Sequence, residues 1–289
     1  MSRFVPDDLR QLISDYRLAI DWLRSEGIRT DVGRLKAYSD FCRNFEDARN
    51  ELEDVVRGMV QFVDMQAVVD IWRHRDGLLA LGDFRDRLLS ISSGNPLYSG
   101  DRNHHPRNIM FEMFCACMLL DVGLTLSPSD MGDISAELSG RRFLFECKRP
   151  SSERMLEQRV REASKQIQDR RIGRAVGVVL LDITLLMNRS LQYWEISDEQ
   201  EGSDVFADHI KLMRVELHDR LIPQLRDRDD AFIGCYWWTP MWNSAQGHWV
   251  IQSRWLLLGS RRCSEMAWHW YQLFDRAAMT RWELAGRTR

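Results

Sequence analysis

Helical and extended patterns of apolar residues alternate along the chain. Across the first third, apolar positions recur every three or four residues, which predicts helices over residues 6–27, 33–48, 50–74 and 79–91. Residues 93–106 are rich in serine, glycine, asparagine and proline, a composition typical of a linker. The pattern therefore predicts an all-helical accessory domain at 1–92 and a second domain at 107–289.

The second domain is predicted to mix helices and strands. After a helix over 107–120 come two short alternating segments, a charged helix that follows Pro150, and an apolar run typical of a strand buried on both faces. That run covers 175–186, and the rest of the chain predicts a helix over 204–225, strands over 231–240 and 248–258, and a closing helix over 264–284. This order indicates an α/β (α+β) domain.

The two alternating segments predict a β-hairpin with a defined register. They cover residues 133–138 and 141–148, and Ser139–Gly140 between them form a plausible two-residue turn. In such a hairpin the numbers of opposed residues keep a constant sum, so Leu138 lies opposite Arg141. This register gathers apolar side chains on one face and places Glu137 opposite Arg142 on the other, whereas a shift of one residue would mix the faces.

The same register places Asp133 opposite Glu146, with Lys148 on the same face. Directly opposed residues have Cβ atoms roughly 5 Å apart, so the two carboxylates could share one divalent cation. Hard oxygen ligands suit Mg²⁺ or Mn²⁺, and a nearby ammonium orients the nucleophile or stabilises developing charge. Cys147 points to the apolar face and offers a metal only its backbone carbonyl. The pattern predicts a metal-dependent phosphodiesterase centre.

Gly132–Asp133 followed by Phe145–Pro150 resembles the PD-(D/E)XK nuclease superfamily, which has the restriction-endonuclease-like fold. The resemblance covers roughly residues 107–186, and a glycine stands where the family name has proline. It implies a mixed sheet flanked by helices, built from a helix, a three-stranded antiparallel meander, a second helix and a further strand. Glu112 on the first helix is then the matching additional carboxylate.

Site roles follow from this resemblance. It implies that Glu112, Asp133, Glu146 and Lys148 are catalytic and that Mg²⁺ (or Mn²⁺) is held by Asp133, Glu146, Glu112 and Cys147. Some members carry a glutamine and a tyrosine four residues apart on the second helix. Here Gln166 is followed at that offset by Arg170.

A local excess of positive charge follows the proposed catalytic strand. The formal net charge of the whole chain is −3, but residues 141–174 hold eleven basic side chains against five acidic ones. Such a helix favours contact with a nucleic-acid backbone, and a solvated helix crossed by ion pairs is the alternative. The candidate nucleic-acid contacts are Arg149, Arg154, Arg159, Lys165, Gln166 and Arg170.

Other sequence features narrow the class of protein. Among 289 residues no apolar run reaches the length of a membrane span, and the first residues do not have the pattern of a signal peptide, so a cytoplasmic protein without membrane association is predicted. Neither G-x-x-x-x-G-K nor G-x-G-x-x-G occurs, so no ATP motif is identified. Six scattered cysteines without a C-x-x-C pair favour reduced thiols over a zinc site.

These observations predict a Mg²⁺-dependent nucleic-acid endonuclease. DNA is favoured over RNA through the resemblance alone, and restriction, defence against foreign DNA and repair fit equally. A non-catalytic nucleic-acid-binding or assembly subunit that retains the fold is the main alternative, and a coincidental match in an unrelated α/β interaction protein is the third. The helical domain is predicted to pack on the nuclease, a partner protein or a second copy in a homodimer.

Overall fold

A computed structural model of the protein describes residues 7–45, 52–94, 105–128, 133–170, 175–188, 192–226 and 231–259. The chain divides into two compact units, an N-terminal unit, Met1–Cys117, and a C-terminal unit, Met118–Arg289. Most of the linker predicted at 93–106, and all of the closing helix predicted over 264–284, lie outside the described residues. Among the described helices, none is both long and apolar enough to cross a membrane.

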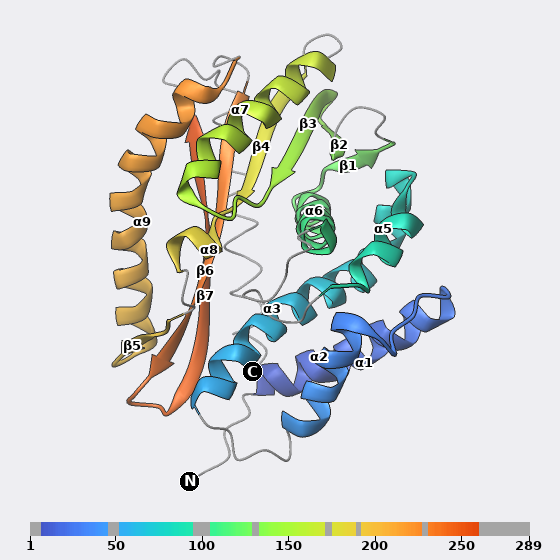
Figure 1. The fold of residues 1–289 in the computed structure, drawn as a ribbon, viewed down its shortest axis with the longest axis vertical. Coiled ribbons are helices and arrows are strands. Elements are labelled where there is room, and N and C mark those ends of the chain that lie inside the picture. The colour runs from blue at the N-terminus through green and yellow to red at the C-terminus, as the bar shows by residue number, and fades with distance from the viewer. Residues whose placement is uncertain are drawn as a thin grey trace. The chain divides into compact units, whose positions relative to one another are not determined.

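The described part of the N-terminal unit is helical, as predicted (Figure 1). The prediction of one helix over 79–91 is wrong for its first turn. Gly82 adopts a positive φ of 68°, which separates a 3-10 turn from the α-helix that follows. The elements are α1 (Asp7–Ser25), α2 (Gly33–Phe45), α3 (Leu52–Arg73), α4 (Arg75–Leu78), η1 (Leu79–Leu81), α5 (Phe84–Ile91) and α6 (His105–Asp121), whose last turn lies in the C-terminal unit.

A buried ion cluster, made of Arg34, Tyr38, Asp64 and Arg107, ties the helices of the N-terminal unit together. Arg107 donates from Nη1 to Asp64 Oδ2 over 2.6 Å, and Nη1 of Arg34 lies 3.7 Å from the same oxygen. The hydroxyl of Tyr38 also donates to Asp64. Burial and the Asp64 carboxylate raise the pKa of Tyr38, so its phenol remains a protonated donor. One carboxylate is therefore shared by two guanidinium groups inside this unit.

In the C-terminal unit, the seven strands of the described residues form one mixed sheet in the order β1-β2-β3-β4-β6-β5, with β7 paired to β6. The first three strands are antiparallel, β4 runs parallel to β3, and β6 is parallel to β4 and β5 but antiparallel to β7. The strands are β1 (Thr125–Ser127), β2 (Ile134–Leu138), β3 (Arg141–Lys148), β4 (Val176–Asp182), β5 (Trp194–Ile196), β6 (Ala231–Asn243) and β7 (His248–Gly259).

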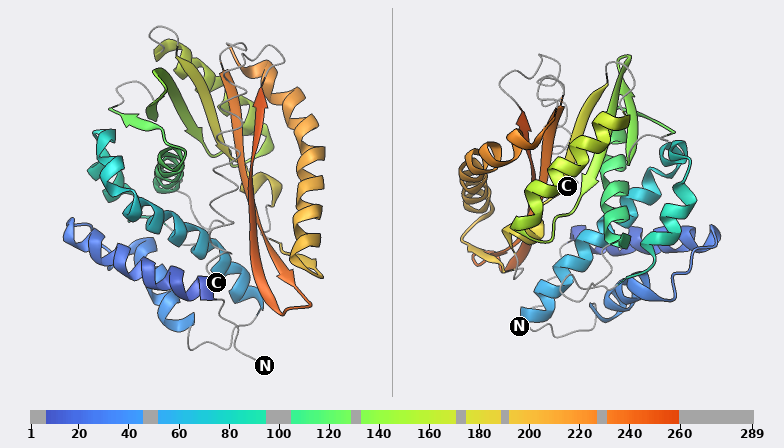
Figure 2. Two further views of the ribbon diagram at one scale, coloured as in Figure 1. Left: turned by 180° about the vertical axis from the view of Figure 1, so that it is seen from behind. Right: turned by 45° about the horizontal axis from the view of Figure 1, so that its top comes forward.

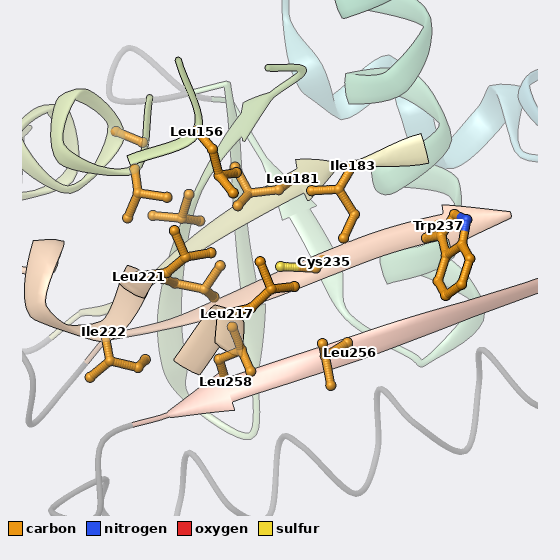
Figure 3. Packing of buried hydrophobic residues seen from close by; sticks show 14 of the residues in the cluster. Leu156, Leu181, Ile183, Leu217, Leu221, Ile222, Cys235, Trp237, Leu256 and Leu258 are labelled. Carbon is orange, nitrogen blue, oxygen red and sulfur yellow. The ribbon is translucent and has the colours of Figure 1, made fainter. Parts of the chain in front are cut away.

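Helices α7 (Glu153–Arg170) and α9 (Glu199–Leu221) cover the same face of this sheet (Figures 1 and 2). Their apolar side chains interlock with those of β4, β6 and β7, as Leu156, Leu217 and Cys235 show in Figure 3. The helix predicted over 204–225 begins earlier, because the Asp198 side chain caps the helix by accepting a hydrogen bond from the Glu201 amide over 2.8 Å.

The prediction of one strand over residues 175–186 is wrong for the last residues of that range. Strand β4 ends at Asp182, whose Oδ1 accepts a hydrogen bond from the amide of Thr184 over 3.1 Å. A short helix, α8 (Thr184–Met187), follows, and a 3-10 turn, η3 (Ile222–Gln224), follows α9. The side-chain hydrogen bond of Asp182 offers the backbone an alternative to the ladder, which explains why the strand stops there.

Close packing of α7 on β4 depends on Gly177. A Cβ atom at this position would lie 2.6 Å from Cγ2 of Ile167, so Gly177→Ala is expected to lower the free energy of unfolding by about 1–3 kcal/mol. Urea unfolding of the variant measures this loss. Because the clash is with one methyl group, the loss should shrink in an Ile167→Ala background, and an equal loss in both backgrounds would contradict this account.

Candidate active site

The predicted hairpin and its register are confirmed. Leu138 pairs with Arg141, and Glu137 pairs with Arg142. Ser139 and Gly140 have φ values of 51° and 75°, the two positive values that a type I′ hairpin turn requires. The turn therefore fixes which side chains share each face of β2 and β3.

Asp133 immediately precedes β2, one residue beyond the last pair of the ladder, Ile134 with Phe145. Its carboxylate Oδ2 accepts a hydrogen bond from the backbone amide of Cys147 over 2.7 Å. The side chain of Cys147 is buried. Asp133 is thus held at the open end of the hairpin by the backbone of β3.

Lys148 joins the two predicted carboxylates. Its Nζ lies 2.8 Å from Oε2 of Glu146 and 3.4 Å from Oδ2 of Asp133. The two oxygens can therefore be no farther apart than the sum of these distances, so both carboxylates lie around one ammonium group. The structure brings together the three residues that the hairpin register predicted.

Burial differs sharply among these three side chains. That of Glu146 is 1% exposed, whereas those of Lys148 and Asp133 are 18% and 22% exposed. Glu146 is enclosed because β3 pairs in parallel with β4 beside it, at Val179, while Asp133 precedes β2 and lies beyond the paired residues of the hairpin. The site therefore has one buried acidic group and one accessible acidic group.

The surroundings shift the pKa of both Glu146 and Lys148. Burial, and then the charge of Asp133, raise the pKa of Glu146. Burial lowers the pKa of Lys148, but the carboxylates of Asp133 and Glu146 outweigh it and raise the pKa above the ordinary lysine value. Lys148 is therefore an ammonium at neutral pH.

Glu146→Gln is expected to flatten the pH dependence of stability just above the ordinary glutamate pKa of 4.5. Below that pH the carboxyl is neutral in both states. As the pH rises, the unfolded chain loses the proton first, so the free energy of unfolding falls until the pH has passed the raised pKa of the folded state. Urea unfolding at a series of pH values in EDTA measures the slope. If the free energy of unfolding falls equally steeply with pH in Glu146→Gln, the slope arises from another titrating group.

One face of α7 lies along the site. We call Glu162, Gln166 and Arg170, spaced four residues apart, the α7 site face. Arg170 donates from Nη1 to Oε1 of Glu146 over 2.6 Å, and Oε1 of Gln166 is buried without a hydrogen-bond partner. Hydrogen bonds from Gln158 and Arg159, with a further contribution from the charge of Lys148, lower the pKa of Glu162.

Glu162 was not predicted as a site residue. The four-residue spacing to Gln166 is a signal that could have found it, because residues at this spacing share a helix face. Its carboxylate accepts hydrogen bonds from Gln158 and Arg159, each over 2.8 Å.

The predicted nucleic-acid contacts fall into different environments. Arg154 and Lys165 are exposed on α7, and Arg159 is paired with Glu162. The side chain of Arg149 is 9% exposed, and its Nε donates to Asp182 Oδ2 over 2.7 Å, so its role in nucleic-acid binding stays a prediction. The ion pair of Arg149 with Asp182 links the end of β3 to the end of β4. Asp182 was not among the site residues predicted from the sequence.

Glu112 lies on α6 within the N-terminal unit and is 9% exposed. Its Oε2 accepts a hydrogen bond from Arg87 Nη1 over 2.6 Å, and Nε of Arg87 donates to Asp83 over 2.8 Å. The carboxylate is therefore neutralised inside its own unit. Its implied role in metal binding stays a prediction.

The donor set suits a magnesium-like ion only with help from other ligands. Among the described residues, no group of three or more His, Cys, Asp and Glu side chains is placed to hold a metal ion. Mg²⁺ is nevertheless usually bound through one or two carboxylates, with water and substrate phosphates completing its octahedron. Asp133 and Glu146 fit that mode, and the carbonyl of Cys147 stays a predicted ligand.

Comparisons of the chain with protein-family models, with curated proteins and with solved structures found no match.

Proposed function

We propose that the chain is a metal-dependent nuclease that hydrolyses phosphodiester bonds, with DNA as the favoured substrate. The observation that carries the proposal is the contact of Lys148 Nζ with Glu146 and Asp133, at 2.8 and 3.4 Å. Two carboxylates of unequal burial with an ammonium between them are what a phosphodiesterase needs to hold a hard cation and stabilise a pentavalent phosphate.

Each residue would have a distinct role. Asp133 and Glu146 would hold Mg²⁺ or Mn²⁺, which supplies a Lewis acid and a bound water of lowered pKa. Lys148 would donate hydrogen bonds to the attacking water or to the phosphate oxygens. Because its pKa is raised, Lys148 remains an ammonium at neutral pH and serves as a donor rather than as a general base.

The order of elements along the chain supports the same proposal. Helix α6, the antiparallel strands β1 to β3, helix α7 and the parallel strand β4 follow one another in the order that the PD-(D/E)XK resemblance implies. Arg154 and Lys165, exposed on α7, are the candidate contacts for the nucleic-acid backbone. Restriction, defence and repair remain equally compatible roles.

A cleavage assay tests the proposal. The purified chain is incubated with duplex and single-stranded DNA and with RNA, in Mg²⁺, Mn²⁺ or EDTA. We expect cleavage of a DNA form that requires the metal and is abolished in Asp133→Asn. Asp208→Asn is the matched control, since Asp208 pairs only with exposed Lys211 among the described residues. Cleavage that persists in EDTA or in Asp133→Asn would overturn the assignment.

One observation favours a second candidate, a nucleic-acid-binding or assembly subunit without catalysis. Both oxygens of Glu146 already have cationic partners, Lys148 and Arg170, so the carboxylate is neutralised by the protein itself. This candidate predicts binding of the same substrates that is indifferent to EDTA, with no cleavage under any metal. Metal-dependent cleavage that disappears in Asp133→Asn would exclude it.

A further inference from the structure

Four charged side chains at the site contact one another and balance in charge. Glu146 contacts Lys148 through Oε2 and Arg170 through Oε1, and Asp133 contacts Lys148. Two carboxylates therefore face two cations. We call this set the site tetrad.

A divalent cation cannot join the tetrad without an electrostatic cost. Beside Glu146 it would stand within a few ångströms of two positive groups, where like charges repel strongly because a buried site screens them poorly. The set would then carry two excess positive charges. Metal binding is thus favoured either by release of one cation or by arrival of an anion such as a phosphodiester.

Arg170 is the cation placed to leave. Its side chain is 38% exposed, against 18% for Lys148, and it is the last residue of α7. Lys148 contacts both carboxylates, whereas the contact of Arg170 within the tetrad is with Glu146 alone. A long side chain that reaches from the surface to a buried carboxylate can return to solvent without unfolding the helix.

We propose that Arg170 is an exchangeable counter-ion: it neutralises Glu146 in the metal-free protein, leaves when the metal binds, and then binds a substrate phosphate beside the site. A planar guanidinium suits phosphate through paired hydrogen bonds. Gln166, one helical turn away, offers a buried Oε1 without a partner that can accept from the released guanidinium. This inference rests on the proposed function and makes metal and nucleic acid bind cooperatively.

The test compares the Mn²⁺ affinity of the full chain, without nucleic acid, in the wild type, Arg170→Met, Arg170→Lys and Arg161→Met. Arg161 is the matched control, because it is exposed on the same helix and donates to Gln224 over 3.2 Å. Arg170→Met should bind Mn²⁺ at least about fivefold more tightly, the lower end of the range for coupled sites. The Mn²⁺ affinity of Arg170→Lys should lie between those of Arg170→Met and the wild type. The Mn²⁺ affinity of Arg161→Met should equal that of the wild type.

A second measurement determines the affinity of the same variants for phosphorothioate DNA in the presence of Mn²⁺. Arg170→Met should bind the DNA several-fold more weakly, opposite to its effect on the metal. Equal Mn²⁺ affinity in Arg170→Met and wild type would overturn the exchange and leave the nuclease proposal standing. Weaker Mn²⁺ binding would also overturn it, since Arg170 would then only position Glu146. Absence of Mn²⁺ binding in every variant would remove the metal-dependent function, and the exchange with it.

Discussion

Lys148→Met is expected to lower the rate of phosphodiester cleavage by about 100- to 10 000-fold, the range measured when a positioned catalytic donor is removed. The ammonium lies between Glu146 and Asp133 on the face where the phosphate would bind. Methionine keeps the length of the stem but removes the charge and the donors. Single-turnover cleavage at saturating Mg²⁺ isolates the chemical step from product release.

Lys165→Met controls for the loss of a lysine on the basic segment, because Lys165 is exposed on α7. It is expected to weaken substrate binding slightly and to leave the single-turnover rate unchanged. The methionine variant at 148 should retain the wild-type unfolding transition to within about 1–2 kcal/mol, which separates a catalytic loss from misfolding. A rate within tenfold of the wild type would remove Lys148 from the mechanism.

Asp64→Asn is expected to lower the free energy of unfolding of the N-terminal unit by about 3–5 kcal/mol. The carboxylate faces Arg107 at 2.6 Å and Arg34 at 3.7 Å, and the two arginine side chains are 3% and 0% exposed. Asparagine preserves the shape and an acceptor for Tyr38 but removes the negative charge that the two buried guanidinium groups share. Urea unfolding followed by circular dichroism measures the loss.

Asp40→Asn is the matched control for that prediction. Asp40 forms ion pairs with Lys36 and Arg43 on the surface of α2, and exposed pairs contribute about 0–1 kcal/mol. A loss in Asp64→Asn no larger than in Asp40→Asn would mean that water reaches the buried ion cluster and screens it.

Local pattern was enough to predict the hairpin and the three residues on its site face. With a two-residue turn and a strand period of two, a single register keeps the apolar and polar side chains on separate faces. That register places Glu146 and Lys148 on the same face as Asp133. The residues of β1 and β5 were not predicted as strands, because three residues each are too few to display a period. Tertiary pairing with β2 and β6 creates them.

Contacts between elements could not be predicted in the same way. Arg170 reaches Glu146 across 24 positions, and whether it does so depends on how α7 is rotated over β3. The salt bridge of Arg87 with Glu112 spans 25 positions and depends on the packing of two helices. Arg34 and Asp64 would be expected on a surface from their residue types, and only the fold reveals that they are buried.

The hairpin turn provides a place for a reporter. Ser139 is exposed in this turn, and the site lies at the opposite, open end of β3. Lys148 lies eight positions after Gly140, roughly 26 Å away at about 3.3 Å per residue. A fluorophore on Ser139→Cys would therefore sit within energy-transfer range of a labelled oligonucleotide while remaining clear of the tetrad, so occupancy could be followed without disturbing the chemistry.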